Sequence, residues 1–157
     1  MTGGIISIIT LCALAALLLT AAATDIRNRT ISNGVNAAIA LIAPLYWWSS
    51  GMALWPDMAI QIGLSVIVFA VFAAVFAAGM MGGGDVKLLA ALALWLPLVP
   101  LMRMLMVMAI AGGVVTLVVL ALHKLRKSDG NPEIPYGVAI AFAGLWAISE
   151  RYLNQFA

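Results

Sequence analysis

The sequence predicts an all-α polytopic membrane protein with about six transmembrane helices. Hydrophobic residues make up 65% of the 157 residues, charged residues make up only 9%, and the mean hydropathy is +1.13. Soluble domains carry about 25% charged residues, whereas a helix that crosses a bilayer needs about 20 apolar residues in succession. We expect a single membrane-embedded domain over residues 1–157, because the short polar segments leave no room for a separate soluble domain.

The predicted spans are apolar runs divided by polar or helix-breaking residues. The first run has the length of one crossing. Its end, Ala21-Ala22-Ala23, resembles a signal-peptidase site, but no basic segment precedes the run, so we expect a retained span. Prolines and consecutive glycines, which interrupt helices, divide the later runs. The six predicted spans are residues 3–23, 34–48, 55–78, 86–101, 104–122 and 135–150. We expect the fourth to bend or end near Pro97 and Pro100.

The cations are distributed unevenly between the two sides of this arrangement. With alternating loops, one side receives Arg27, Arg29, Lys87, Lys124, Arg126 and Lys127, and the other receives only Arg103 and Arg151. Cytoplasmic loops are enriched in Lys and Arg, so the side with six cations is expected to be cytoplasmic and both termini to lie outside. The five tryptophans are expected at the outer interface, where indole rings are favoured: Trp47, Trp48, Trp55, Trp95 and Trp146.

The segment from Gly79 to Lys87 is the most unusual part of the chain, because it places four glycines and Asp85 between apolar runs. A carboxylate at membrane depth is costly and normally has a function or a partner. Glycines let another backbone approach closely, and irregular backbone at this depth is tolerated where it is buried in protein or lines a wet cavity. The segment therefore predicts a functional site beside Asp85.

A second carboxylate is predicted to lie at the same side and at a similar depth. Asp25 follows the first span, just as Asp85 precedes the fourth. The other four acidic residues have simpler interpretations: a helix cap at Asp57, solvated loop residues at Asp129 and Glu133, and an interfacial anchor at Glu150.

A simpler alternative is that each of the two acids pairs with a nearby cation. Asp25 would then pair with Arg27 or Arg29, and Asp85 with Lys87. However, residues two positions apart on a helix point to nearly opposite faces, and Lys87 is expected to extend toward the lipid headgroups.

Two carboxylates that share a site suggest hydrolysis by an aspartic dyad. Two such groups cannot both ionise cheaply, so one keeps its proton. The ionised carboxylate can activate water, while the protonated one can donate to a carbonyl oxygen, and peptide bonds are hydrolysed in this way without a metal ion or a covalent intermediate.

The sequence offers little support for other chemistry. His123 lies in a basic loop without Ser and Asp partners, an HExxH motif is absent, and no Lys-Ser or Lys-Thr follows the glycines to form a phosphate-binding loop. Cys12 is the single cysteine, so neither a disulfide nor a cysteine zinc site is expected. We expect no cofactor and no metal ion, and no nucleic-acid partner, because no basic surface with interleaved aromatic residues is present.

Two segments resemble a known family at the predicted acids. Gly82-Gly83-Gly84-Asp85 resembles the Gly-x-Gly-Asp motif of intramembrane aspartic proteases, with Lys87 in the position where type IV prepilin peptidases often carry a lysine. The segment 25–33 resembles the first aspartate segment of that family, in which an Asp is followed by basic residues and Ile-Pro-Asn. Asn33 matches that asparagine, and Ser32 replaces the proline.

A third segment extends the resemblance to the end of the chain. Ile134-Pro135-Tyr136-Gly137 is similar to the Pro-Phe-Gly segment that opens the last span in this family. The paired-cysteine region of the long prepilin peptidases, which is linked to N-methylation, has no counterpart, so the chain resembles the short Tad/Cpa-type enzymes.

The resemblance implies a prepilin leader peptidase of the bacterial inner membrane, with its active site on the cytoplasmic side. The implied catalytic residues are Asp25 and Asp85, with Gly82 and Gly84 shaping the opening beside the acid and Lys87 fixing depth or touching substrate. Implied partners are membrane lipid and a prepilin or pseudopilin precursor with a basic leader and an apolar helix. The family cuts such precursors after a glycine at the membrane boundary.

A small proton- or ion-conducting or transporter subunit is the competing hypothesis, because intramembrane carboxylates also mark such pathways. The remaining spans offer few polar residues to continue a path across the membrane, mainly Gln61, Ser65 and Thr116.

Overall fold

The computed structural model describes residues 2–125 and 134–153, and within them the predicted all-α fold is confirmed. An irregular helical segment, η1 (Leu54–Met58), leads into the third helix, and the backbone of Trp55 within it is extended. The α-helices of these described residues are α1 (Thr2–Asn28), α2 (Asn33–Ser49), α3 (Ala59–Ala77), α4 (Gly83–Ala93), α5 (Leu98–Leu125) and α6 (Tyr136–Leu153).

Three helical segments are long and apolar enough to cross a membrane, which identifies a membrane protein. They are Gly4–Asn28, Leu54–Ala77 and Leu98–Leu125, and a shorter apolar helix covers Tyr136–Glu150. The predicted fourth span, 86–101, is divided in two, with the break four residues before Pro97, near the predicted bend or end. α4 has 11 residues, about 16 Å at the usual helical rise, and α5 begins only four residues after it, at Leu98.

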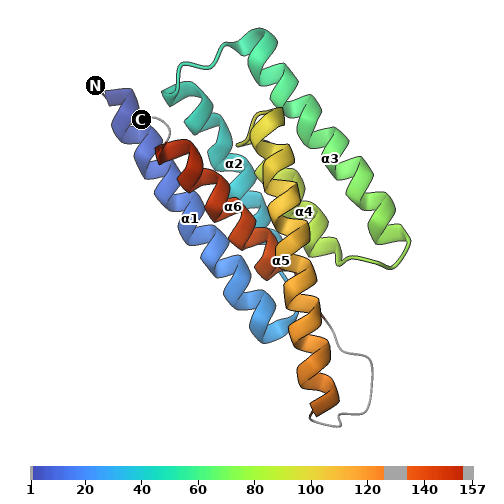
Figure 1. The fold of residues 1–157 in the computed structure, drawn as a ribbon. Helices are drawn as coiled ribbons and strands as arrows, with labels where there is room; N and C mark the ends of the chain where they lie inside the picture. The colour runs from blue at the N-terminus through green and yellow to red at the C-terminus, as the bar shows by residue number, and fades with distance from the viewer. Residues whose placement is uncertain (1, 126–133, 154–157) are drawn as a thin grey trace.

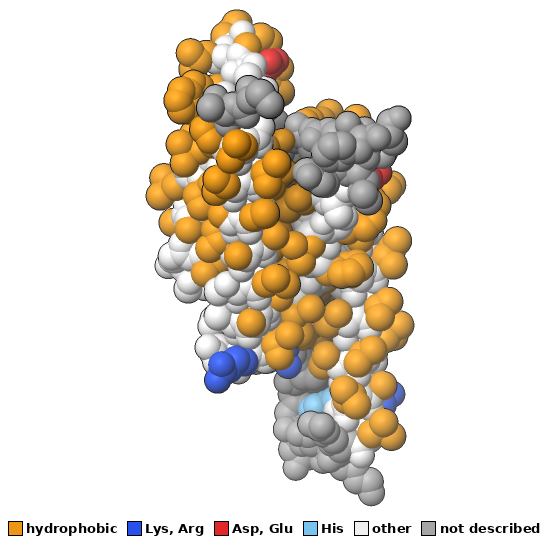
Figure 2. All heavy atoms as spheres, turned by 90° about the vertical axis from the view of Figure 1, so that its left-hand side faces the viewer, with side chains coloured by type: hydrophobic (Ala, Val, Ile, Leu, Met, Phe, Trp, Pro, Cys, Tyr) orange, Lys and Arg blue, Asp and Glu red, His pale blue; other side chains and the backbone are white. Residues whose placement is uncertain are grey.

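The short helix α4 lies inside the bundle. It packs against α2, α3 and α6, while α1 packs against α2 and α6, and α5 against α6. The ends of α1, α3 and α5 and the beginnings of α2, α4 and α6 lie toward one end of the molecule, the lower end in Figure 1. Lys and Arg side chains gather toward this end, whereas hydrophobic side chains cover most of the face drawn in Figure 2.

The carboxyl end of α4 stops within the bundle, where its last carbonyl groups need donors from other helices. Side chains of α2 and α3 supply them. Gln61 Nε2 donates to the carbonyls of Ala93 and Leu96. Ser65 Oγ donates to the carbonyl of Ala90 at 2.7 Å, and Trp47 Nε1 donates to the carbonyl of Leu94 at 2.8 Å. A short helix can therefore end at this depth without unpaired carbonyl groups.

The prediction that all five tryptophans lie at the outer interface is wrong for two of them. Trp48 and Trp55 are 74% and 80% exposed, as an interfacial position requires. Trp47 and Trp95 are instead buried, and the indole N–H of Trp95 donates to the carbonyl of Ile39 at 3.0 Å. Their amphipathic rings satisfy backbone groups within the bundle, a use that the sequence pattern does not distinguish from an interfacial one.

Replacing Gln61 by Leu is expected to lower the thermal unfolding temperature in detergent. The substitution keeps the volume similar but leaves the carbonyls of Ala93 and Leu96 without their donor, at a cost of about 1–3 kcal/mol for each unsatisfied buried group. Thr116→Val is the control, because the Thr116 hydroxyl donates to the carbonyl of Gly112 in its own helix. Equal unfolding temperatures for Gln61→Leu and the unmodified chain would show that this cap contributes nothing.

Candidate functional site

Asp25 and Asp85 are both buried, and they come from two different helices, α1 and α4. Asp25 lies in the last turn of α1, which continues to Asn28, so this acid is on the helix rather than after it. Asp85 lies in the first turn of α4. Their exposed fractions are 5% and 8%. Because α1 ends and α4 begins toward the same end of the bundle, the fold brings together two acids 60 positions apart.

The charge of Asp25 acts on Asp85. Burial and, to a smaller extent, the negative charge of Asp25 raise the pKa of Asp85 to about 6, and the backbone of Gly82 opposes both effects. A charge influences a partner in this way only at short range. The two groups therefore share one local environment.

Pairing with neighbouring cations, the simpler alternative, is not observed among the described residues. Neither carboxylate forms an ion pair there, although the charge of Arg29 acts on Asp25, and the ion pair that is present joins Arg103 to Glu150. Lys87 turns away from Asp85 and donates from Nζ to Asn33 Oδ1 at 2.8 Å. This bond joins two of the residues predicted to support the site, one from α2 and one from α4.

Asp25 lies against the amino end of α6. The backbone N–H groups of Gly137 and Val138 face its carboxylate, while Oδ2 is buried and forms no hydrogen bond of ordinary geometry. A Cβ on Gly137 would lie 2.8 Å from Asp25 Oδ2 and 2.7 Å from Ile31 Cδ1. Pro135, also predicted to support the site, is buried directly before the helix. Only glycine permits this approach.

The glycine motif makes two similar contacts around Asp85. A Cβ on Gly82 would lie 3.1 Å from Asp85 Oδ2. A Cβ on Gly84 would lie 3.3 Å from both the Cβ and the carbonyl oxygen of Ile31. Ile31 thus lies between the beginning of α4 and the beginning of α6, and it connects the surroundings of the two acids.

Sequence reasoning missed two residues, Ile31 and Asn36. Asn36 is 5% exposed and donates from Nδ2 to the carbonyl of Gly84 at 3.1 Å, which fixes the residue before Asp85. Its Oδ1 is buried without a partner. The signal was present, because Asn36 is a polar residue in an apolar span and lies one helical turn after Asn33. Ile31 carried no such signal.

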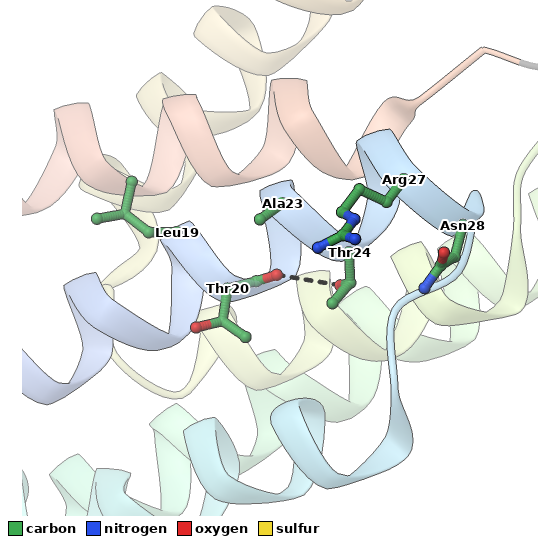
Figure 3. Close-up of a pocket in the computed structure, with 6 residues that line it drawn as sticks. All are labelled: Leu19, Thr20, Ala23, Thr24, Arg27 and Asn28. Atoms are coloured by element: carbon green, nitrogen blue, oxygen red, sulfur yellow. Dashed lines mark hydrogen bonds between the residues drawn. The ribbon is translucent and has the colours of Figure 1, made fainter.

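The opposite face of α1 carries a shallow pocket that contains neither acid. Figure 3 shows its six lining residues, with Arg27 and Asn28 near the end of the helix and the Thr24 hydroxyl donating to the carbonyl of Thr20. Arg27 therefore points to a different face from the one that buries Asp25. Within the described residues, no group of three or more His, Cys, Asp or Glu side chains could hold a metal ion.

The raised pKa of Asp85 predicts a pH-dependent stability. The folded state binds the proton of the Asp85 carboxyl group more tightly than the unfolded state does. The stability that this proton contributes is therefore fully present below about pH 4 and is lost as pH rises through about 6. The difference from the usual 3.8 corresponds to about 3 kcal/mol. We expect the unfolding temperature of the unmodified chain, relative to that of Asp85→Asn, to fall between pH 4 and 7 and then stay level. A difference independent of pH would contradict the described surroundings of Asp85.

Comparison with known proteins gives one match. A family model described as the type IV leader peptidase family matches residues 12–117, a range that includes both acids and the glycine motif. No curated protein and no solved structure matches the chain significantly.

Proposed function

The chain belongs to the type IV leader peptidase family, and we propose that it is a prepilin leader peptidase in which Asp25 and Asp85 form the catalytic dyad. Membership identifies a membrane-embedded protease. The observation that carries the finer assignment is the burial of two carboxylates from different helices, close enough for the charge of one to raise the pKa of the other. We propose further that residues 1–157 act as one peptidase domain.

The proposed reaction uses one ionised and one protonated carboxyl group. The ionised group takes a proton from water as the water oxygen attacks the scissile carbonyl, and the protonated group donates to the carbonyl oxygen. The tetrahedral intermediate then collapses, the carbon–nitrogen bond breaks, and the amine leaves with a proton from the dyad. The net change is the addition of one water across one peptide bond.

The residues around the dyad support this role by limiting its movement. Gly137 lets the amino end of α6 approach Asp25, and Gly82 lets the backbone approach Asp85. Asn33 and Lys87 join α2 to α4, and Asn36 holds the Gly84 carbonyl. Precise placement of reacting groups accounts for a large part of enzymatic rate enhancement.

The proposed substrates are single-span precursors with a basic leader, cut at the cytoplasmic boundary of the bacterial inner membrane. The two acids lie toward the end of the bundle where Arg27, Arg29 and Lys124 also lie, and cations are enriched on the cytoplasmic side. Water and a non-helical scissile segment are accessible at this boundary but scarce at the bilayer centre.

A proton relay, the competing hypothesis, would need polar side chains free to pass protons across the membrane. Gln61 and Ser65 instead donate to carbonyls of the α4 segment, and Thr116 donates to Gly112 in its own helix. These bonds favour a structural use of the three residues and therefore favour the peptidase.

Co-expression with a single-span protein that carries a basic leader ending in glycine tests the proposed function. We expect the precursor to lose the mass of its leader only when the chain is present. A set of such precursors that all keep their full mass would overturn the assignment.

The proposed orientation predicts which positions react with membrane-impermeant thiol reagents. In a Cys12→Ala background, a cysteine at Asn28 is expected to be labelled only from the cytoplasmic side, and one at Ser50 only from outside, because the two residues lie toward opposite ends of the bundle. Labelling of Asn28 from outside intact cells would invert the orientation and separate the dyad from cytoplasmic leaders.

A further inference from the structure

Ile31 covers the space beside the two acids. It belongs to the connection 29–32, which joins the end of α1 to the beginning of α2. Ile31 is 7% exposed, whereas the other three residues of this connection are exposed. The connection therefore contacts the interior of the bundle through one side chain, at the end of the ring that α1, α2, α4 and α6 form by packing in pairs.

The Ile31 side chain adjoins both acids through the glycines next to them. A Cβ on Gly84, the residue before Asp85, would lie 3.3 Å from Ile31 Cβ. A Cβ on Gly137 would lie 2.7 Å from Ile31 Cδ1 and 2.8 Å from Asp25 Oδ2. Ile31 Cδ1 and Asp25 Oδ2 therefore lie against the same side of Gly137, and the space between the beginnings of α4 and α6 is filled by one isoleucine.

A peptide bond cannot reach the dyad while this side chain is in place. Reacting groups must come within about 3–3.5 Å of each other, but the two acids are only 5% and 8% exposed. The helices α2 and α4 are held together, because Asn36 Nδ2 donates to the carbonyl of Gly84 at 3.1 Å and two buried indoles join the same helices near their other ends.

The connection is held far less firmly than these helices. Thr30 and Ile31 form no hydrogen bond with any residue that the structure describes. Moving them away from the acids therefore costs the packing of one apolar side chain, whereas separating α2 from α4 would break several buried hydrogen bonds. Displacement of Ile31 is the smallest change that uncovers both acids.

We propose that the scissile segment of the precursor binds in the space held by Ile31, after the connection 29–32 has moved aside. The inference rests on the proposed function, because the precursor is the molecule that must reach the dyad. An α-helix with its side chains is about 10–12 Å wide, whereas this space holds a single side chain. The segment that replaces Ile31 is therefore an extended peptide, unwound around the scissile bond.

Thiol labelling tests whether the precursor displaces the connection. Ile31→Cys and Thr30→Cys are each made with Cys12→Ala and Asp85→Asn, so that bound precursor is not consumed, and each reacts with N-ethylmaleimide in liposomes. Without precursor, we expect slow reaction at the buried position 31 and rapid reaction at the exposed position 30. With precursor above its KM, the reaction at position 31 should become several times faster. A rate at position 31 that stays level or falls would overturn the proposal.

A kinetic comparison tests the same point in the active protein. Ile31→Val deletes only Cδ1, the atom nearest to Gly137. We expect kcat/KM for the precursor to rise about fourfold, the equivalent of one buried methylene group that no longer has to be displaced. Ile39→Val is the matched control, because Ile39 is a fully buried isoleucine of α2 whose carbonyl is bonded to Trp95, near the opposite end of α4. Its kcat/KM should not change.

The direction of the change separates a cover from an ordinary core residue. If Ile31 only supported the positions of the acids, Ile31→Val would lower kcat/KM, and a value equal to or below that of the unmodified chain would overturn the proposal. Processing by the unmodified chain would still support the peptidase in that case. Absence of processing by the unmodified chain would instead reject the function itself.

Discussion

Asp25→Asn and Asp85→Asn are each expected to abolish leader cleavage. An amide can neither take a proton from water nor give one to a carbonyl oxygen, and removal of a general acid or base typically costs roughly 10²–10⁴-fold in rate. Since the two groups act as one unit, the double variant should be no slower than either single variant. Cleavage is measured as the fraction of precursor converted over time in cells that co-express both proteins.

The control for this prediction is the folded state of each variant. Asn is close to Asp in size, and an uncharged amide is easier to bury than a carboxylate, so both variants should insert and unfold at or above the temperature of the unmodified chain at neutral pH. Near-normal processing by either variant would remove that residue from the dyad.

Gly137→Ala is expected to cause the second largest loss of activity. The added Cβ would lie 2.8 Å from Asp25 Oδ2, 2.9 Å from Asp25 Cγ and 2.7 Å from Ile31 Cδ1. These distances are too short for real contacts, so the Asp25 carboxyl group and the Ile31 side chain must move away, or α6 must shift. A displacement of this kind at a reacting group costs roughly 100-fold in rate. The measurement is kcat, because the displaced group belongs to the proposed catalytic pair.

Gly113→Ala is the matched control, because its Cβ would meet nothing within 4 Å. The control should keep its rate within about twofold, as exposed substitutions usually do. If Gly137→Ala retained the rate of Gly113→Ala, the close approach of α6 to Asp25 would have no catalytic importance.

Much of this arrangement was accessible from the sequence because membrane burial makes polar residues conspicuous. Asp25 and Asp85 were identified as exceptions in apolar surroundings, and the structure brings them together. The glycines at 82, 84 and 137 were identified through a family resemblance, but their contacts could not be predicted. A sequence does not show which neighbouring group a glycine allows to approach. The position of Ile31 beside both Gly84 and Gly137 is visible only in the packed structure.

The short α4 shows why the rest could not be predicted. Hydropathy does not distinguish a helix that crosses the membrane from one that ends inside the protein, because both are apolar. The difference lies in Gln61, Ser65 and Trp47, which supply donors to the end of α4 from distant parts of the chain. From the sequence alone, Gln61 and Ser65 suggest a polar path and Trp47 suggests an interfacial belt. Only the structure shows that all three donate to backbone carbonyls near the end of α4.

Reconstitution of the purified chain with a purified precursor in liposomes tests the central claim most directly. Intact-mass spectrometry should find two products, the leader and the mature protein, whose masses sum to that of the precursor plus one water, and neither product should form with Asp25→Asn or Asp85→Asn. Products of the same mass from either variant, or a precursor that stays whole with the unmodified chain, would contradict hydrolysis of the leader by this pair of carboxylates.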